Sequence, residues 1–420
     1  MTGGRHLAEW LALQEGVHGT AIDLGLDRVR AVAQRLELLP FAPRSIIVAG
    51  TNGKGSTVAC LTQLLRAQGA TVGSFTSPHL LRYNERIRVN GAEVSDTQIV
   101  AAFEAIEAAR GDITLTFFEF NALAALWIFA QRGVQFAVLE VGLGGRLDAV
   151  NIVDAEASVV CSIGLDHADW LGSDLDGIAR EKAGVFRRDQ WVVLSDPSMR
   201  PAVELEAQRI GARVLKAGRD FHWQQGGDGD SWSYIGAARR FDSLRLPALR
   251  GQVQLANAAA SITTLLGLGV DLQAAHINRA LPRLRLPGRF QIIAGPVEWI
   301  LDVAHNEPAA AVLAGNLRAR ACAGRTLAVA GILGDKDVDA IARELAPVVD
   351  QWVLCGLDVP RGLDASALRG RSPVFQAAHE ASDVRAGMEL AAQLARPGDR
   401  IVVCGSFLTV TPALCLLGLY

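Results

Sequence analysis

The chain has 420 residues, half of them apolar, and a formal net charge of -3. This length exceeds what one hydrophobic core usually serves, so we expect two domains, and the apolar content excludes a disordered protein. The nearly balanced charge leaves no basic stripe, which argues against nucleic acid as a main partner.

The cysteines and the apolar runs indicate in which cellular compartment the protein is expected. Six cysteines are scattered without a C-x-x-C pair, so we expect buried free thiols in a reducing environment and no zinc site. Residues 1–15 lack the apolar core of a signal peptide, and no run approaches the roughly 18 apolar residues that span a bilayer. A cytoplasmic protein without membrane partners is therefore expected.

Short β-rich apolar runs alternate with helical patterns in the first half of the chain. Strands are predicted at residues 45–49, 71–75, 136–141 and 158–163. Helices are predicted at residues 57–68, 96–109 and 119–132, the second opened by a capping box of Ser95 and Gln98. This alternation is typical of a parallel sheet covered on both faces.

The pattern weakens after Asp189 and then returns. The Gly/Asp-rich segment 225–230 predicts a turn between strands at the rim of the first domain, and residues 254–266 predict a helix. Beyond a turn sequence at 286–289, strands are predicted at residues 298–303, 326–332, 351–355 and 400–404. We therefore predict an α/β protein, with a P-loop-type, mostly parallel sheet domain over residues 1–288 and a smaller Rossmann-like α/β domain over residues 289–420.

Residues 50–56, GTNGKGS, follow a predicted strand and precede a predicted helix, which is the order found in a phosphate-binding loop. Glycines let backbone N–H groups approach an anion, the helix start adds partial positive charge, and Lys54 adds a full one. Gly55 stands where a hydroxyl residue would usually bind magnesium, so the ion must find oxygens elsewhere. The alternative is a glycine turn with a solvated lysine.

Polar residues follow several predicted strands, at the edge where open parallel sheets bind ligands. Glu140 ends one strand and leads into a glycine-rich loop, Asp166 and His167 follow another, and Ser77 follows a third. A carboxylate, an imidazole and a hydroxyl beside a phosphate loop could form a magnesium shell. Singly, each has a plainer explanation: a surface charge, a hydrogen-bonded core histidine and a turn residue before proline.

Several of these motifs together resemble the dihydrofolate synthase/folylpolyglutamate synthase family, which belongs with the Mur ligases. They are GTNGKGS, SPHL at 77–80, ERI at 85–87, TFFE at 116–119 and EVGLGGRLDAVN at 140–151, followed by LPGRFQ at 286–291, LDVAHN at 301–306, GDKD at 334–337 and CGS at 404–406. The resemblance covers nearly the whole chain in the right order. It implies an ATP-dependent ligase that joins L-glutamate to dihydropteroate and adds γ-linked glutamates to reduced folates, through an acyl phosphate, with release of ADP and phosphate.

The resemblance also implies roles for individual residues. It assigns ATP to Gly53, Lys54, Gly55, Ser56, Asn257, Arg289 and Asp302, and two magnesium ions to Ser77, Glu140, His167 and a carbamate on Lys182. Lys54, Lys182 and His305 are the implied catalytic residues, with His305 lining the glutamate pocket. From the residues alone, Lys182 would be interpreted as a solvated helix lysine.

Three segments match the dihydropteroate-binding positions of the family: Thr20, Ala21, Ile22 and Asp23; Thr116, Phe117, Phe118 and Glu119; and Leu147, Asp148 and Ala149. Paired phenylalanines can stack on a flat pterin or aminobenzoyl ring, and Asp23 or Asp148 could accept hydrogen bonds from pterin N–H groups. The alternative is that Phe117 and Phe118 are ordinary core at the start of a helix.

One departure and two other functions stay open. The family usually has proline directly after His305 and Asn306, whereas here Glu307 comes before Pro308, which puts the glutamate contacts in doubt. A Mur-type ligase for a cell-wall or other peptide precursor is one alternative, and a nucleotide-hydrolysing P-loop switch or motor is the other. We expect a monomer.

Overall fold

The structure is a computed structural model that describes residues 5–20, 22–227, 229–237 and 239–420. The chain divides into two compact units, the first made of Met1–Ala248 and Gln252–Leu284 and the second of Leu249–Gly251 and Arg285–Tyr420. The second unit thus begins four residues before the predicted boundary at residue 289. Each unit is built around its own sheet with helices, so the predicted α/β class is confirmed.

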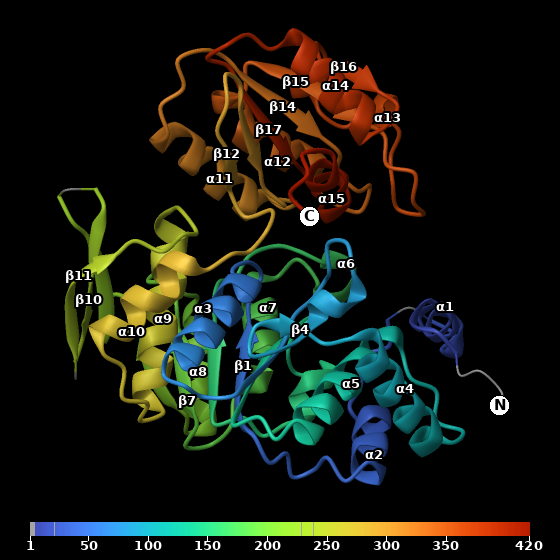
Figure 1. The fold of residues 1–420 in the computed structure, drawn as a ribbon, viewed down its shortest axis with the longest axis vertical. Coiled ribbons are helices and arrows are strands. Elements are labelled where there is room, and N and C mark those ends of the chain that lie inside the picture. The colour runs from blue at the N-terminus through green and yellow to red at the C-terminus, as the bar shows by residue number, and fades with distance from the viewer. Residues whose placement is uncertain (1–4, 21, 228, 238) are drawn as a thin grey trace. The chain divides into compact units, whose positions relative to one another are not determined.

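The first unit contains a sheet of eight strands, six of which run parallel (Figure 1). Only β3 and β4, at one edge, pair antiparallel. In spatial order the strands are β4 (Ala92–Glu93), β3 (Ile87–Val89), β2 (Val72–Phe75), β5 (Phe136–Glu140), β1 (Arg44–Ala49), β6 (Ala157–Val160), β7 (Trp191–Leu194) and β8 (Arg213–Lys216).

The strand order reverses at β1, and this fixes where a ligand can bind. From β1 the chain passes to β2, returns to place β5 between them, and then crosses to β6 on the other side of β1. Loops that leave the carboxyl ends of β1, β5 and β6 therefore diverge around one point. Such switch points are where open parallel sheets bind ligands.

Helices cover both faces of this sheet. One core gathers α1 (Leu7–Val17), α2 (Asp27–Arg35), α4 (Asp96–Arg110), α5 (Phe117–Gln131), α7 (Leu175–Lys182) and α8 (Pro201–Ile210). It includes Ile47 and Ala49 of β1, whereas Ile46 and Val48 alternate with them and point to the opposite face. The helix α3 (Lys54–Ala67) packs against both α9 (Gln252–Gly267) and α10 (Ala274–Ala280), as Figure 1 shows. The short α6 (Ala168–Leu171) precedes α7.

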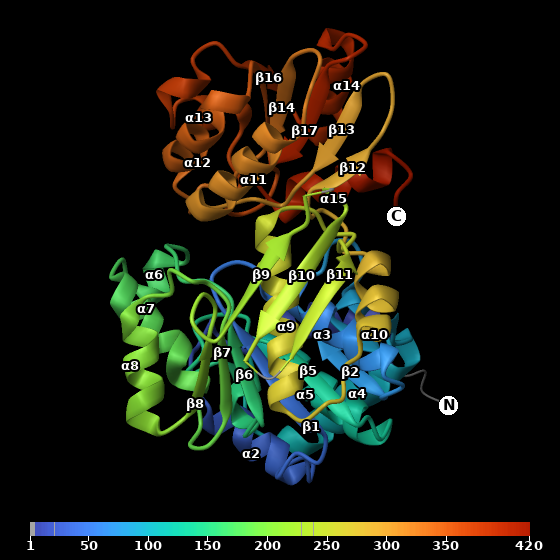
Figure 2. The same ribbon diagram turned by 90° about the vertical axis from the view of Figure 1, so that its left-hand side faces the viewer.

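A second, antiparallel sheet packs against α9 (Figure 2). Its strands are β9 (Phe221–Gln225), β10 (Ser231–Gly236) and β11 (Arg240–Arg245). The hydroxyl of buried Tyr234 lies 3.0 Å from that of Thr263 on α9, which joins the sheet to the helix. The turn predicted at 225–230 connects β9 to β10, although Asp228 lies outside the described residues.

The second unit contains a sheet of six strands, with only β12 antiparallel. The order is β12 (Gln291–Ile293), β13 (Glu298–Leu301), β17 (Arg400–Cys404), β14 (Thr326–Ala330), β15 (Gln351–Cys355) and β16 (His379–Ala381). Its helices are α11 (Glu307–Ala319), α12 (Val338–Leu345), α13 (Ala365–Arg369), α14 (Val384–Leu394) and α15 (Phe407–Leu416). The four strands predicted here all exist, so the Rossmann-like arrangement was readable from periodicity.

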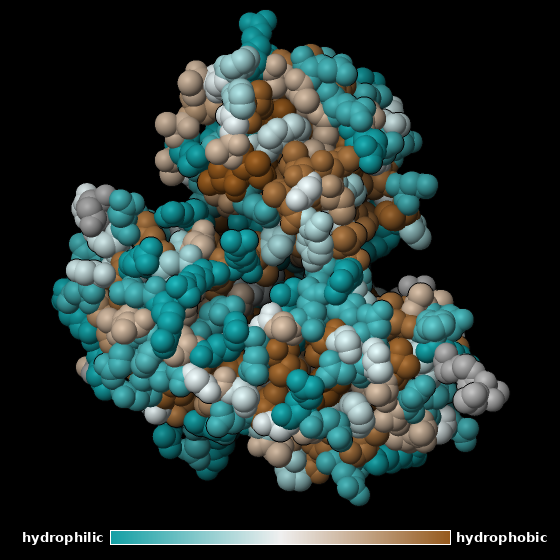
Figure 3. All heavy atoms as spheres, viewed as in Figure 1, coloured by the Kyte–Doolittle hydropathy of each residue, from teal (hydrophilic) through white to brown (hydrophobic). Residues whose placement is uncertain are grey.

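The outer surface mixes hydrophilic and hydrophobic residues on the face seen in Figure 3. Among the described residues, no helix is long and apolar enough to cross a membrane. The six cysteines are free thiols, four of them buried.

Candidate active site

The glycine-rich loop after β1 leads directly into α3. The helix begins at Lys54, three residues earlier than the predicted start at residue 57, and Gly53 caps it in a left-handed conformation with φ of 89°. Lys54, Gly55 and Ser56 therefore form the first turn, where backbone N–H groups have no intrahelical partner. These donors and the positive end of the helix dipole form the kind of anion site that the loop sequence predicts.

Two lysines converge on one carbonyl of this loop. The Nζ of Lys54 donates to the carbonyl oxygen of Gly50 at 3.0 Å and to that of Thr51 at 3.2 Å. The Nζ of Lys182 donates to the same Gly50 oxygen at 3.2 Å, although Lys182 is 132 residues after Gly50 in the chain. Lys182 at the end of α7 is therefore part of the loop's surroundings.

Lys182 is buried, with 5% of its surface exposed, so the solvated helix lysine is the wrong interpretation. Burial and then the nearby positive charge of Lys54 lower the pKa of Lys182 from 10.5 to about 7, and the opposing effect of Asp166 is smaller. A substantial fraction of neutral amine at physiological pH follows. Asp166 is thereby placed near Lys182, a proximity that the sequence did not indicate.

The phosphate loop is held against the segment after β6. The hydroxyl of Thr51 bonds both the backbone N–H and the carbonyl of Gly164, at 3.0 Å each. The hydroxyl of Ser162 accepts from the N–H of Asn52 at 3.0 Å and donates to its carbonyl at 3.1 Å. These bonds fix the path of the loop that carries Asp166 and His167.

Glu140 and Ser77 lie together beside the phosphate loop, as predicted from the strand ends. The Oε2 of Glu140 accepts a hydrogen bond from the backbone N–H of Ser77 at 3.2 Å. A Cβ placed on Gly55 would lie 3.7 Å from the same Oε2, so the carboxylate faces the first turn of α3. Glu140 is itself buried, with 4% of its surface exposed.

His167 lies on the loop between β6 and α6 and is more exposed than the other predicted metal ligands. Its Nε2 is 4.0 Å from the carboxylate of Asp166, and 40% of its side chain is exposed. Its backbone has φ of 52°, a left-handed conformation uncommon for a residue with a side chain.

Asn257, which the resemblance assigns to the nucleotide, approaches the start of the phosphate loop. A Cβ on Gly53 would lie 3.1 Å from the Oδ1 of Asn257, and the residue is buried on α9. Its amide nitrogen donates to Gln254 at 3.2 Å, which orients the carboxamide. The phosphate loop thus lies between α9 on one side and Glu140 on the other.

The donor set suits magnesium bound together with phosphate. Within the described part of the chain, no group of three or more His, Cys, Asp and Glu side chains gathers as a metal site. Mg²⁺ is commonly held by one or two carboxylates, with phosphate oxygens and water completing its octahedron. Glu140, directly beside the first turn of α3, is placed for such a partial shell.

Two of the three segments predicted to bind pteroate, residues 20–23 and 116–119, are joined by Arg28. Its Nη1 donates to the Oδ2 of Asp23 at 2.6 Å, and its Nη2 lies 3.2 Å from the Oε1 of Glu119. Glu119 also forms a capping box with Thr116 at the start of α5. Thr20 and Ile22 precede Asp23 in the same segment, whereas Ala21 lies outside the described residues. Arg28 was missed because it lies in an ordinary helical pattern.

Phe117 and Phe118 are partly buried at the start of α5 and face different neighbours. Phe118 packs against Phe75, with ring centroids 5.8 Å apart, and its ring approaches within 2.6 Å of a Cβ placed on Gly142. Phe117 lies near Tyr83 and beneath the guanidinium of Arg86, whose carbon is 5.4 Å from the ring centre. Their partial exposure leaves ring surface available to a ligand.

Asp148 organises the glycine-rich loop after β5. Its Oδ2 accepts from the N–H groups of Gly142 and Leu143, at 2.9 and 3.0 Å, and its Oδ1 accepts from Val150 at 3.1 Å. Burial outweighs these donors and raises the pKa of Asp148 to about 6. Asp23, with 41% of its side chain exposed, is better placed than Asp148 to meet a pterin. The flanking Leu147 is 39% exposed and Ala149 is buried.

Two of the three predicted site residues of the second unit, Arg289 and His305, lie beside Phe407, which the sequence did not indicate. The guanidinium carbon of Arg289 lies 5.1 Å from the centre of the Phe407 ring, and the ring of His305 lies 5.9 Å from it. Asp302 accepts from the N–H groups of Phe290 and Ala304, and burial raises its pKa. His305 bonds the carbonyl of Val303 through Nδ1 at 2.7 Å.

The replacement of proline by Glu307 leaves the following helix intact. Asn306 caps α11 through its side chain, which accepts from the N–H of Ala309 at 3.0 Å. Glu307 and Pro308 take the first two helical positions, where proline is tolerated because its missing N–H needs no partner.

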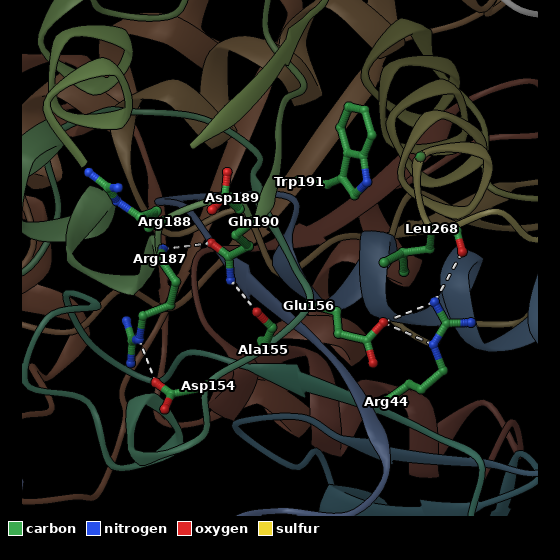
Figure 4. A pocket seen from close by; sticks show the side chains of 11 residues that line it. Arg44, Asp154, Ala155, Glu156, Arg187, Arg188, Asp189, Gln190, Trp191 and Leu268 are labelled. Carbon is green, nitrogen blue, oxygen red and sulfur yellow. Dashed lines mark hydrogen bonds and ion pairs between the residues drawn. The ribbon is translucent and has the colours of Figure 1, made fainter. Parts of the chain in front are cut away.

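A separate hollow of about 440 Å³ lies at the amino ends of β1, β6 and β7, away from the phosphate loop (Figure 4). Arg44 pairs with Glu156 and Arg187 with Asp154, while Gln190 bonds the carbonyl of Ala155. These charges neutralise one another, and the carboxyl ends of the strands are at the opposite edge. The hollow is therefore a weaker candidate for catalysis than the phosphate loop.

Comparison with known families matches both units of the chain. Residues 48–265 match the Mur ligase middle domain, and residues 288–407 match the Mur ligase glutamate ligase domain. The chain is 43% identical to the dihydrofolate synthase/folylpolyglutamate synthase of Escherichia coli K12, over 96% of this chain and 94% of that protein.

Solved structures agree. E. coli FolC in complex with DHPP and ADP has a TM-score of 0.95 and 41% identity, covering 99% of each chain. A bifunctional folylpolyglutamate synthase/dihydrofolate synthase with Mn, AMPPNP and L-glutamate bound has a TM-score of 0.92 and 41% identity, covering 100% of each chain. The chain therefore belongs to the dihydrofolate synthase/folylpolyglutamate synthase family of Mur ligases and is an ATP-dependent ligase.

Proposed function

We propose that this chain joins L-glutamate to dihydropteroate, forming dihydrofolate, and adds γ-linked glutamates to reduced folates, with phosphoryl transfer at the phosphate loop of the first unit. The observation that carries this proposal is the gathering of Lys54, Lys182 and Glu140 around the phosphate loop. Both lysines bond the carbonyl of Gly50, and Glu140 faces Gly55. The aromatic start of α5 lies against Gly142, two residues after Glu140.

The reaction has two substitutions. An oxygen of the substrate carboxylate attacks the γ-phosphorus of ATP, the bond to the bridging oxygen breaks, and ADP leaves. The amine of glutamate then attacks the acyl phosphate, loses a proton and displaces phosphate. The protein's task is to neutralise and orient charge, because the phosphoryl group needs no covalent help. Lys54 and the N–H groups of residues 53–56 are placed to hold the β- and γ-phosphates.

The proposal assigns magnesium to Glu140, Ser77, His167 and a carbamate on Lys182, with two ions in all. Bound magnesium would neutralise charge on the phosphate oxygens. Glu140 is the best supported of these ligands because its carboxylate faces Gly55 and bonds Ser77. Lys182 has the buried, partly neutral amine that reaction with carbon dioxide requires.

Glu140→Gln should raise the magnesium concentration that half-maximal activity requires by about tenfold or more, because it removes an anionic ligand and keeps the shape. His167→Ala should act in the same direction. Magnesium titrations of initial rate test both. Glu156→Gln is the matched control, since this carboxylate pairs with Arg44 at the opposite edge of the sheet. Titrations unchanged in both variants would contradict the assignment.

Phe118→Ala should weaken dihydropteroate binding by about 1–3 kcal/mol, the order expected for a lost aromatic contact, while ATP binding stays unchanged. Calorimetric titrations with each ligand separate the two effects. A thermal melt checks the lost packing against Phe75. Equal weakening of ATP and dihydropteroate would show a general collapse of the site.

Purified protein with ATP, magnesium, glutamate and dihydropteroate should release ADP, phosphate and dihydrofolate. With a reduced folate it should form a γ-linked product, and the two acids should compete for one site. Folate extension without dihydrofolate synthesis would leave only the polyglutamate synthase. Activity on a cell-wall precursor alone would favour the other Mur-type ligase. Hydrolysis of ATP that depends on neither acid would favour a P-loop switch or motor.

The remaining assignments rest on the resemblance. Arg289 and Asp302 are proposed to contact the nucleotide and His305 the glutamate. This is supported by the approach of Arg289 and His305 to Phe407, and by the electrostatic interaction of Asp302 with both residues. Dihydropteroate is proposed to contact the segments around Asp23, Glu119 and Asp148. A monomer in the cytoplasm stays a prediction, testable by light scattering and cell fractionation.

A further inference from the structure

Arg86 is a nearly buried arginine beside the site that the reaction described so far does not use. It ends a short 3₁₀ helix, Tyr83–Arg86, directly before β3, and 8% of its surface is exposed. Its carbonyl accepts from the N–H of Thr76 at 2.9 Å, and the next residue, Ile87, pairs with Phe75 of β2. Arg86 is thereby fixed next to the strand end that continues into Ser77.

The guanidinium is held rigidly from one side. Its Nε donates to Nδ1 of His79 at 2.8 Å, and its carbon lies 5.9 Å from the centre of the Tyr83 ring and 5.4 Å from that of Phe117. A guanidinium stacked on aromatic rings keeps its remaining N–H donors in a fixed plane. The two rings and His79 thus orient the group without using its terminal nitrogens.

The nearby carboxylates are occupied by other donors. Glu85 accepts from the N–H groups of Leu80, Leu81 and Arg82, at 2.6–2.8 Å. Glu140 attracts the charge of Arg86 but faces Gly55 and Ser77. In the described part of the chain, the side chain of Arg86 donates its hydrogen bond through Nε, and none is described for Nη1 or Nη2.

Burial of this charge is costly, and an anion at the terminal donors would offset part of that cost. An anion that meets it would lie between Phe117, which is proposed to contact the aromatic part of the substrate, and Glu140 beside the phosphate loop. A carboxylate attached to an aminobenzoyl ring has the required chemistry, because a guanidinium binds a carboxylate through two parallel hydrogen bonds.

We propose that Arg86 binds the substrate carboxylate and presents one of its oxygens to the γ-phosphate. This inference rests on the proposed function and adds the residue that positions the attacking group. Arg86 takes no part in proton transfer: one carboxylate oxygen forms the new bond to phosphorus, the other keeps its hydrogen bond to the guanidinium, and ADP carries away the bonding electrons.

The test compares dihydropteroate with an analogue in which hydrogen replaces the carboxyl group, using calorimetry on the intact protein without turnover. Wild-type protein should bind the acid more tightly than the analogue. Arg86→Gln should weaken binding of the acid by about 10- to 100-fold and leave binding of the analogue unchanged. Arg88→Gln is the matched control, because Arg88 lies two residues after Arg86 and pairs with Glu93. Its substitution should change the binding of neither ligand.

Other results would overturn the inference. An equal loss of affinity for the acid and for the analogue would make Arg86 a packing residue for Phe117. Weaker binding of AMPPNP alone would assign Arg86 to the nucleotide phosphate. Arg86→Lys keeps the charge; if Arg86→Gln does not fold, this variant should raise the KM for dihydropteroate and not for ATP, and an unchanged KM would reject the inference. Wild-type protein that forms no dihydrofolate would reject the proposed function itself, which separates the two failures.

Discussion

Lys54→Ala should lower kcat by about 10²-fold or more without unfolding the protein. Negative charge moves toward the leaving β-phosphate during phosphoryl transfer, and Lys54 is the full positive charge within the first turn of α3. Its ammonium is positioned by the carbonyls of Gly50 and Thr51, at 3.0 and 3.2 Å. Because these bonds fix the ammonium beside the loop, little reorganisation should be needed when the charge develops.

Single-turnover formation of ADP, measured by rapid quench with saturating ATP, isolates the step in question. The decrease should appear in this rate and exceed any change in ATP affinity. Lys216→Ala is the control, because it removes an equal charge at the edge strand β8, where Lys216 pairs with Glu204. Near-normal turnover in Lys54→Ala would remove Lys54 from the mechanism.

The phosphate loop shows how much of a site the local sequence can predict. Strand, glycines and lysine predicted the cradle, but the helix was placed three residues late because glycine is a poor helix former. Gly55 nevertheless lies in the first turn, where a Cβ on this residue would lie 3.7 Å from the carboxylate of Glu140. The first turn of α3 therefore faces a carboxylate that is 85 positions away in the chain, which the local sequence does not reveal.

The meeting of Glu140 and Ser77 was predictable, because parallel strands end at one edge and both residues follow neighbouring strands. The edge strand β8 was not predicted, since Arg213–Lys216 is half polar and too short to show a period. Arg28, Arg86 and Phe407 gave no signal of their own. Each acts through partners distant in sequence, which composition and spacing do not reveal.

Lys182 is the sharpest example of this limit. Its own helix, α7, predicts an exposed lysine, and only the resemblance suggested otherwise. The carbonyl that it meets belongs to Gly50, 132 residues earlier in the chain. Burial follows because the side chain at the end of α7 reaches the phosphate loop, a contact that no local pattern encodes. The same burial lowers the pKa of Lys182, and carbamate formation requires the neutral amine that results.

Lys182→Ala should lower kcat by about 10³-fold or more, because loss of a carbamate would remove an anionic oxygen ligand and metal stabilisation of phosphate charge is worth several kcal/mol. Formation of the carbamate needs the neutral amine to attack carbon dioxide and lose a proton. With a pKa of about 7 rather than 10.5, Lys182 is largely neutral at pH 8 and largely cationic at pH 6. Carbamate occupancy should therefore fall as the pH drops through about 7.

The chain is unusually favourable for observing this group, because it contains only four lysines, Lys54, Lys182, Lys216 and Lys336. Protein equilibrated with ¹³C-bicarbonate should give a carbamate carbon signal that Lys216→Ala retains and Lys182→Ala lacks. Stripping carbon dioxide should lower wild-type activity, and its return should restore it. Acetate, which can place a carboxylate in the space left by the side chain, should partly rescue Lys182→Ala and leave wild-type activity unchanged. A bare amine at Lys182 in a high-resolution map with occupied metal sites would reject the carbamate, whereas the contact with Gly50 would still make Lys182 a positioning residue of the loop.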